Sequence, residues 1–133
     1  HWYPDFDGDN YGNPAISLWQ CTQPAQYVLD NTDCNDNDAN IYPGGPTVRI
    51  KKATTSYYSA LQSAFDSATN MDIIQNRTAV LTEDLLLNRN ISIVIKAGYN
   101  CDYSSNSGLT MVNGNVMIND GLLIVEEGTL QIQ

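Results

Sequence analysis

Cations and histidine are scarce in this sequence. Six lysines and arginines face fifteen aspartates and glutamates, and the formal net charge is -9. Nucleic acids and anionic membrane surfaces are bound by clustered cations, so this balance argues against both as partners. No apolar run approaches the roughly 20 residues that span a bilayer, and membrane insertion is not expected. The one histidine, His1, stands at the first position, where it cannot serve a buried catalytic triad. We therefore do not expect an enzyme.

Cysteine is also scarce, with three residues in the chain. Cys21 and Cys34 bracket a loop in the acidic first third, and we predict a disulfide between them, which would contribute about 3 kcal/mol by loop-entropy reasoning. Cys101 is left over and is expected to be bonded to neither; a buried inert thiol and an intermolecular partner both fit it. Disulfides persist outside the cytoplasm, and the chain begins at His1 rather than Met. We expect an exported protein, extracellular or at the cell surface, whose signal peptide has been removed.

Aspartate is abundant, in two clusters near the N-terminus. One alternates with other residues from position 5 to position 9, and the other surrounds Cys34. Seven carboxylates in so short a segment repel one another unless a cation neutralises them, and all-oxygen ligation favours Ca²⁺ over transition metals. An EF-hand loop starting at Asp5 is excluded, because Asn10 and Ile16 stand where that loop needs Gly and a bidentate Glu. The predicted ligands are Asp5, Asp7, Asp9, the Tyr11 carbonyl, Asp30, Asp33, Asp36 and Asp38.

The first 45 residues also carry a wider pattern around these aspartates. Its parts are Trp2 to Gly12, Cys21, Tyr27-Val28, Asp30 to Asp38, and Ile41 to Gly44. Together they resemble the metal-binding repeat of bacterial secreted and surface proteins, a relative of the thrombospondin type 3 calcium repeats. The resemblance implies Ca²⁺ ligation by the aspartates.

The composition changes near Pro43-Gly44-Gly45-Pro46, so we expect a calcium-binding head, residues 1–45, and a β-rich body, residues 46–133. In the body, Ser56 is predicted to cap a helix at about 56–69. Its apolar residues recur at spacings of three and four, which places them on one core-facing side: Tyr57, Leu61, Ala64, Phe65 and Ala68. Short strands are predicted at 48–50, 72–75, 79–87 and 91–95, and around residues 116–118, 122–124 and 130–132.

Strands of this length fit a sandwich, a meander or successive coils of a β-solenoid. The helix followed by Met71 to Gln75 and Leu81 to Asn88 resembles the N-terminal cap and first coils of right-handed parallel β-helix proteins, over residues 48–98. That resemblance implies a mainly β fold, with one capping α-helix and a short β-solenoid.

We expect from these features an exported, calcium-stabilised structural protein. The last six residues, 128–133, alternate apolar and polar and carry no charge, so this exposed edge is predicted to pair with another copy. The expected product is a homo-oligomer or polymer, such as an extracellular filament or surface layer. Two alternatives remain open: a monomeric calcium-binding domain of a longer surface protein, and a fragment of a carbohydrate-active β-helix enzyme.

Overall fold

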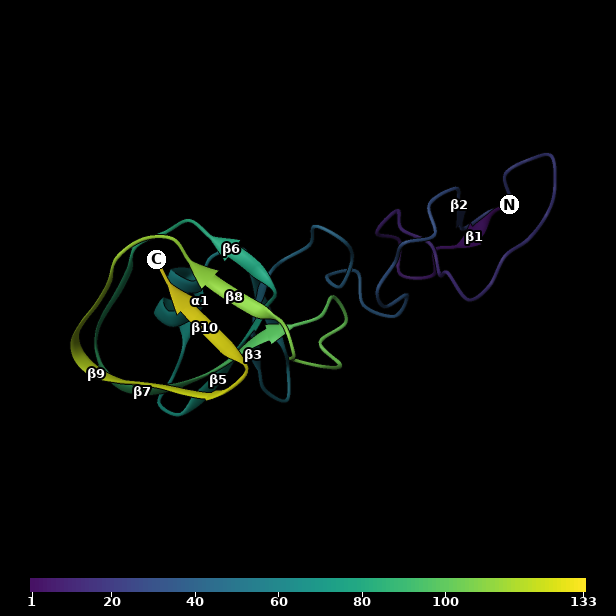
Figure 1. Cartoon of the computed structure of the whole chain (residues 1–133). Coiled ribbons are helices and arrows are strands. Elements are labelled where there is room, and N and C mark those ends of the chain that lie inside the picture. The colour runs from purple at the N-terminus through teal and green to yellow at the C-terminus, as the bar shows by residue number, and fades with distance from the viewer. The chain divides into compact units, whose positions relative to one another are not determined.

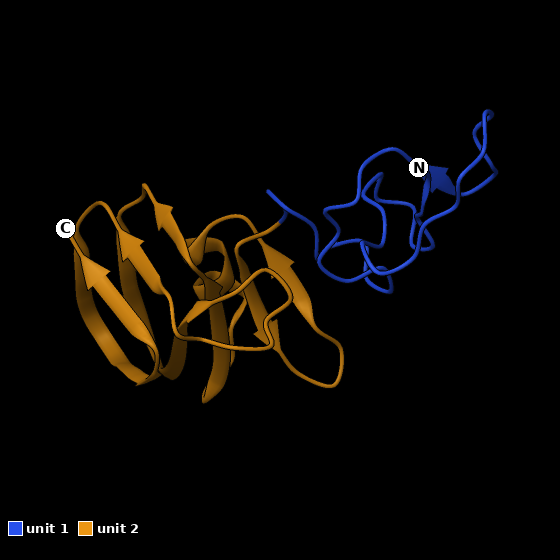
Figure 2. Ribbon diagram, turned by 45° about the vertical axis from the view of Figure 1, so that its right-hand side comes forward, with its two compact units in different colours: residues 1–45 blue, residues 46–133 orange.

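The computed structural model describes all residues, 1–133, and the chain divides into two compact units. The first, the head, is His1–Gly45, and the second, the body, is Pro46–Gln133 (Figure 2). The division falls at the change of composition in the sequence.

The head is built mostly of turns. Its one regular pairing is antiparallel, between β1 (Tyr3–Pro4) and β2 (Tyr27–Val28). Gly12 lies against this pair, and a Cβ atom there would come within 2.5 Å of the Asp30 carbonyl oxygen and 2.6 Å of the Tyr3 Cβ. With so little sheet or helix, the head depends on side chains to satisfy its backbone groups.

The body is mainly β with one short helix, and its strands form two sheets that do not close into a barrel. One sheet has the order β4-β3-β5-β7-β9 and the other the order β10-β8-β6. Figure 1 shows β7 beside β9 in the first sheet and β8 beside β10 in the second. The elements are β3 (Val48–Lys51), β4 (Ser56–Tyr58), α1 (Leu61–Ser67), β5 (Asp72–Arg77), β6 (Ala79–Leu81), β7 (Leu85–Tyr99), β8 (Leu109–Val112), β9 (Val116–Glu127) and β10 (Thr129–Ile132).

Successive passes of the body's chain lie beside one another in parallel. β5 pairs with β7 and β7 with β9, while β6 pairs with β8 and β8 with β10. Ile74, Ile95 and Val125 thus occupy neighbouring positions in three consecutive passes. At Gly121, within β9, φ is +82° and a Cβ atom would lie 2.3 Å from the Ile91 carbonyl oxygen, so the close approach of these passes requires glycine there.

Burial drops sharply in the last pass. Ile95 is 0% exposed, whereas Val125 beside it is 47% exposed. The same contrast separates Leu87 at 1% from Ile118 at 50%, and the fully buried Val112 from the half-exposed Ile132. The apolar stack therefore continues to the final strands and is open on their far side.

The helix prediction is wrong at its N-terminal end. Ser56 to Tyr58 form β4, in which Ser56 pairs with Ile50, and the helix covers only Leu61–Ser67. Strand pairing with β3 satisfies the backbone groups that the predicted first turn would have used. The predicted core face is otherwise confirmed, because its remaining members are buried: Leu61, Ala64, Phe65 and Ala68.

The strand prediction for 79–87 is also wrong as a continuous element. β6 ends at Leu81 and β7 begins at Leu85, with a change of direction at Glu83 and Asp84. β8 was not predicted. The only helix, α1, has seven residues and is too short to cross a membrane.

Candidate metal centre

The first acidic loop of the head folds around the carboxylate of Asp5. Oδ1 of Asp5 accepts the backbone N–H groups of Gly8 at 2.8 Å and Asp9 at 3.1 Å, and Oδ2 accepts that of Asn10 at 3.1 Å. Gly8 and Asn10 adopt the left-handed conformation, with φ of +83° and +75°. Residues that tolerate positive φ thus let the loop close on one side chain.

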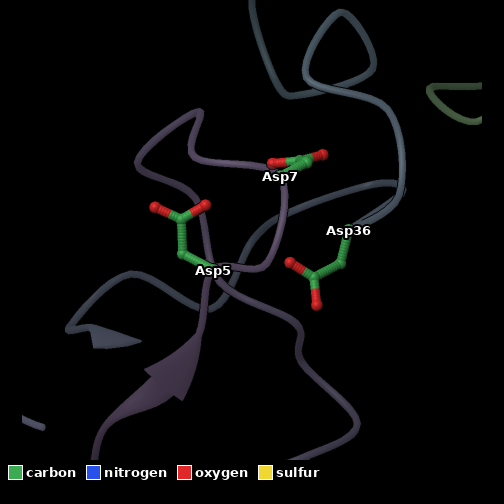
Figure 3. Close-up of side chains that lie close together, drawn as sticks. All are labelled: Asp5, Asp7 and Asp36. Atoms are coloured by element: carbon green, nitrogen blue, oxygen red, sulfur yellow. The ribbon is translucent and has the colours of Figure 1, made fainter. Parts of the chain in front are cut away.

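Asp36 joins this loop from the second acidic cluster. Its Oδ1 accepts the backbone N–H of Phe6 at 2.8 Å, and the side chain is 6% exposed. Carboxylate oxygens of Asp5, Asp7 and Asp36 lie within 4.8 Å of one another (Figure 3). The two clusters predicted from the sequence to share a cation therefore supply one group of oxygens.

Three carboxylate oxygens of the head lack any hydrogen bond although they are buried. They are the Oδ2 atoms of Asp7, Asp9 and Asp33. In each residue the other oxygen accepts the backbone N–H two residues ahead, at 3.3, 2.8 and 3.1 Å respectively. Asp33 is only 6% exposed. Buried charged oxygens without a partner are costly, and a cation is the group that would satisfy several of them at once.

The electrostatics of these side chains point the same way. Burial raises the pKa of Asp7, and the neighbouring charge of Asp9 raises it further. Burial is also the main cause of the raised pKa values of Asp9 and Asp33, and backbone N–H donors oppose both shifts. The charge of Asp33 raises the pKa of Asp9, and the charge of Asp7 raises the pKa of Asp33. The charged forms are thus disfavoured in the metal-free head, and a bound cation would reverse this.

The donor set fits a hard cation. The grouped atoms are carboxylate oxygens, without a histidine nitrogen or a cysteine sulfur among them. Ca²⁺ takes six to eight oxygens from carboxylates, carbonyls and water in a flexible geometry, and Mg²⁺ demands a tighter octahedron. The group of Asp5, Asp7 and Asp36 therefore has the chemistry to hold a metal ion.

Asp30 and Asp38, also predicted as ligands, are not among the three grouped carboxylates. Asp30 accepts the backbone N–H and the hydroxyl of Thr32, and Asp38 accepts the backbone N–H and amide of Asn40. Both carboxylates therefore hold local turns. The Tyr11 ring stacks on Tyr42, with centroids 5.1 Å apart.

The predicted Cys21–Cys34 disulfide is wrong, and so is the prediction that Cys101 is bonded to neither of these cysteines. Cys34 is bonded to Cys101, and Cys21 is an exposed free thiol. The position of two cysteines around a loop does not determine pairing when a third is present.

Asn13 is a site residue that the sequence reasoning missed. Its amide donates to Oδ2 of Asp36 at 3.4 Å, and its backbone N–H donates to the Pro4 carbonyl at 2.8 Å. It lines a hollow of about 250 Å³ together with Asp33 and Asp36. The prediction used the spacing of aspartates, and an asparagine is not part of that pattern. In the sequence, only the position of Asn13 directly after Gly12, next to the first acidic cluster, could have indicated it.

Comparison with protein-family models gives no match, and neither curated proteins nor solved structures give a significant match to this chain.

Proposed function

We propose that this chain is an exported, calcium-stabilised structural protein that assembles into an extracellular filament or surface layer, and that it is not an enzyme. The observation that carries the calcium part is the buried, unpartnered Oδ2 of Asp33, beside those of Asp7 and Asp9. The disulfide of Cys34 fits an oxidising compartment.

Calcium in this proposal stabilises the head. Its unfolded chain lacks the convergence of the two acidic loops, so the ion binds the folded form preferentially. Such a ligand adds about 2.7 kcal/mol to stability when its free concentration is a hundred times its Kd. The head has only short β strands and few buried apolar residues, so this contribution is large relative to its own packing.

The body in this proposal is the start of a β-solenoid. Parallel pairing of each pass with the one before it, on two sheets, supports this. α1 packs Leu61, Ala64 and Phe65 into the same apolar cluster as the first strands. The last pass exposes Ile118, Val125 and Ile132 by about half. An open layer of this kind loses apolar exposure and gains backbone pairing when a further strand covers it.

Sedimentation velocity of the intact chain, with Ca²⁺ and with excess chelator, tests the proposal. We expect high-mass species with Ca²⁺ at high protein concentration. Replacing Leu130 and Ile132 by Lys should abolish them while the head stays folded. A wild-type monomer under all these conditions would overturn the assembly part and leave a monomeric calcium-binding surface domain.

A further inference from the structure

We propose that the partner at the open end of the five-stranded sheet is the β4 edge of a second copy of this chain, added head to tail. This rests on the proposed self-assembly and specifies its contact. The sheet has two edges, β9 and β4, and each has an unpaired side.

The strand directions permit continuous pairing between copies. β3 is antiparallel to both β4 and β5, so β4 runs in the same direction as β5 and therefore as β7 and β9. A second copy displaced along the stacking direction would thus present β4 parallel to β9, the relationship that already joins β7 to β9.

The registers of the two edges also agree. Ser56 on β4 stands in one row with Ile50, Ile74, Ile95 and Val125 across the sheet. In the second copy, Ser56 would continue this row beyond Val125, whose side chain is 47% exposed.

The charges of the edges are opposite. β9 carries Asp120, Glu126 and Glu127, and Lys96 is the only cation that pairs with any of them. Near β4, the exposed Lys51 lies at the end of β3, while Lys52, just beyond it, is paired with Asp72 at 2.7 Å. The row of Lys51 runs through Ile73 and Val94 to Ile124, a position between the acidic residues of β9.

Contact of β9 with β9 of a second copy is the competing arrangement. It would bring two edges of the same acidic character together, which opposes association. It would also close into a dimer, whereas the β9-to-β4 contact repeats without limit. The charges therefore favour the head-to-tail contact and a filament.

Charge reversal on each edge separates these arrangements. Lys51→Glu alters only the β4 side, and Asp120→Lys with Glu126→Lys alters only the β9 side. In Ca²⁺, we expect each variant alone to form about tenfold less of the high-mass species than wild type, because like charges then face each other at the contact. An equimolar mixture of the two variants should recover them, because opposite charges meet at both contacts of an alternating assembly: one contact is the wild-type pair and the other is its reversal.

The outcomes are distinct. Circular dichroism must first show that each variant is folded; Lys51→Gln and Asp120→Asn are the milder substitutes if one is not. If wild type forms only dimers and Lys51→Glu leaves them unchanged, the head-to-tail contact is wrong while self-assembly stands. If wild type assembles but the mixture does not recover, the two edges do not meet. A monomeric wild type overturns both proposals.

Discussion

The carboxylate of Glu83 accepts the backbone N–H of Leu61 at 2.8 Å, at the first residue of α1. Its other oxygen accepts the backbone N–H of Gln62 at 2.9 Å. Residue 60 is alanine, whose side chain cannot cap the helix. Glu83, in the turn between β6 and β7, caps it instead. At the other end of the helix, Arg89 donates to the carbonyl oxygens of Phe65 and Asp66. The acidic and basic groups thus match the helix dipole.

Replacing Glu83 by Ala should therefore destabilise the body. Two backbone donors at the start of a buried helix would lose their acceptors, at a cost of about 1–2 kcal/mol in the free energy of unfolding. Urea unfolding of the intact chain measures this. Glu126→Gln is the matched control, because that carboxylate is half exposed and its ion pair with Lys96 contributes little. Equal stability of the two variants would show that the Glu83 cap is unimportant.

The core-facing side of α1 could be predicted from the sequence, but its first residue could not. Its apolar spacing at Leu61, Ala64 and Phe65 depends on local geometry and was predicted correctly. Its start was not, because Ser56 can cap a helix or lie in a strand, and only pairing with the distant Ile50 decides. Likewise, the acidic spacing indicated Asp5, Asp7 and Asp36, while the role of Asn13 and the partner of Cys34 depend on tertiary contacts.

The disulfide predicts a defined peptide map. Digestion without reduction should release one linked pair containing Cys34 and Cys101, and Cys21 should react with an alkylating reagent in the native protein. Recovery of a peptide linking Cys21 to either of the others would contradict this. Reduction should lower the free energy of unfolding by about 4 kcal/mol by loop-entropy reasoning.

Asp72 predicts an acid dependence of the body's stability. Burial alone would raise its pKa, but hydrogen bonds from Lys52, at 2.7 Å, and from Thr69 lower the pKa below the ordinary 3.8. The unfolded chain then binds the proton first, so this contribution is present above about pH 4 and is lost as pH falls through the folded pKa. Asp72→Asn should be less stable than wild type at pH 7, and the difference should shrink below pH 4. A difference that does not change with pH would exclude the ion pair as its cause.

Asp33→Asn should change stability in opposite directions with and without calcium. In excess chelator at pH 7, the variant should be more stable than wild type, because the raised pKa of Asp33 marks a charge that the fold disfavours. With saturating Ca²⁺ it should be less stable, because a ligand oxygen is gone. Thermal unfolding under both conditions checks this. Asp66→Asn, at an exposed position on α1, should show no such reversal.

Binding of Ca²⁺ to the intact chain, followed by isothermal titration calorimetry after removal of metal, tests the central claim most directly. We predict saturable binding that weakens at least about tenfold in Asp33→Asn and is unchanged in Asp66→Asn. Mg²⁺ should bind more weakly than Ca²⁺. Absence of saturable Ca²⁺ binding to the folded wild-type chain, or equal affinity in all three proteins, would contradict the account.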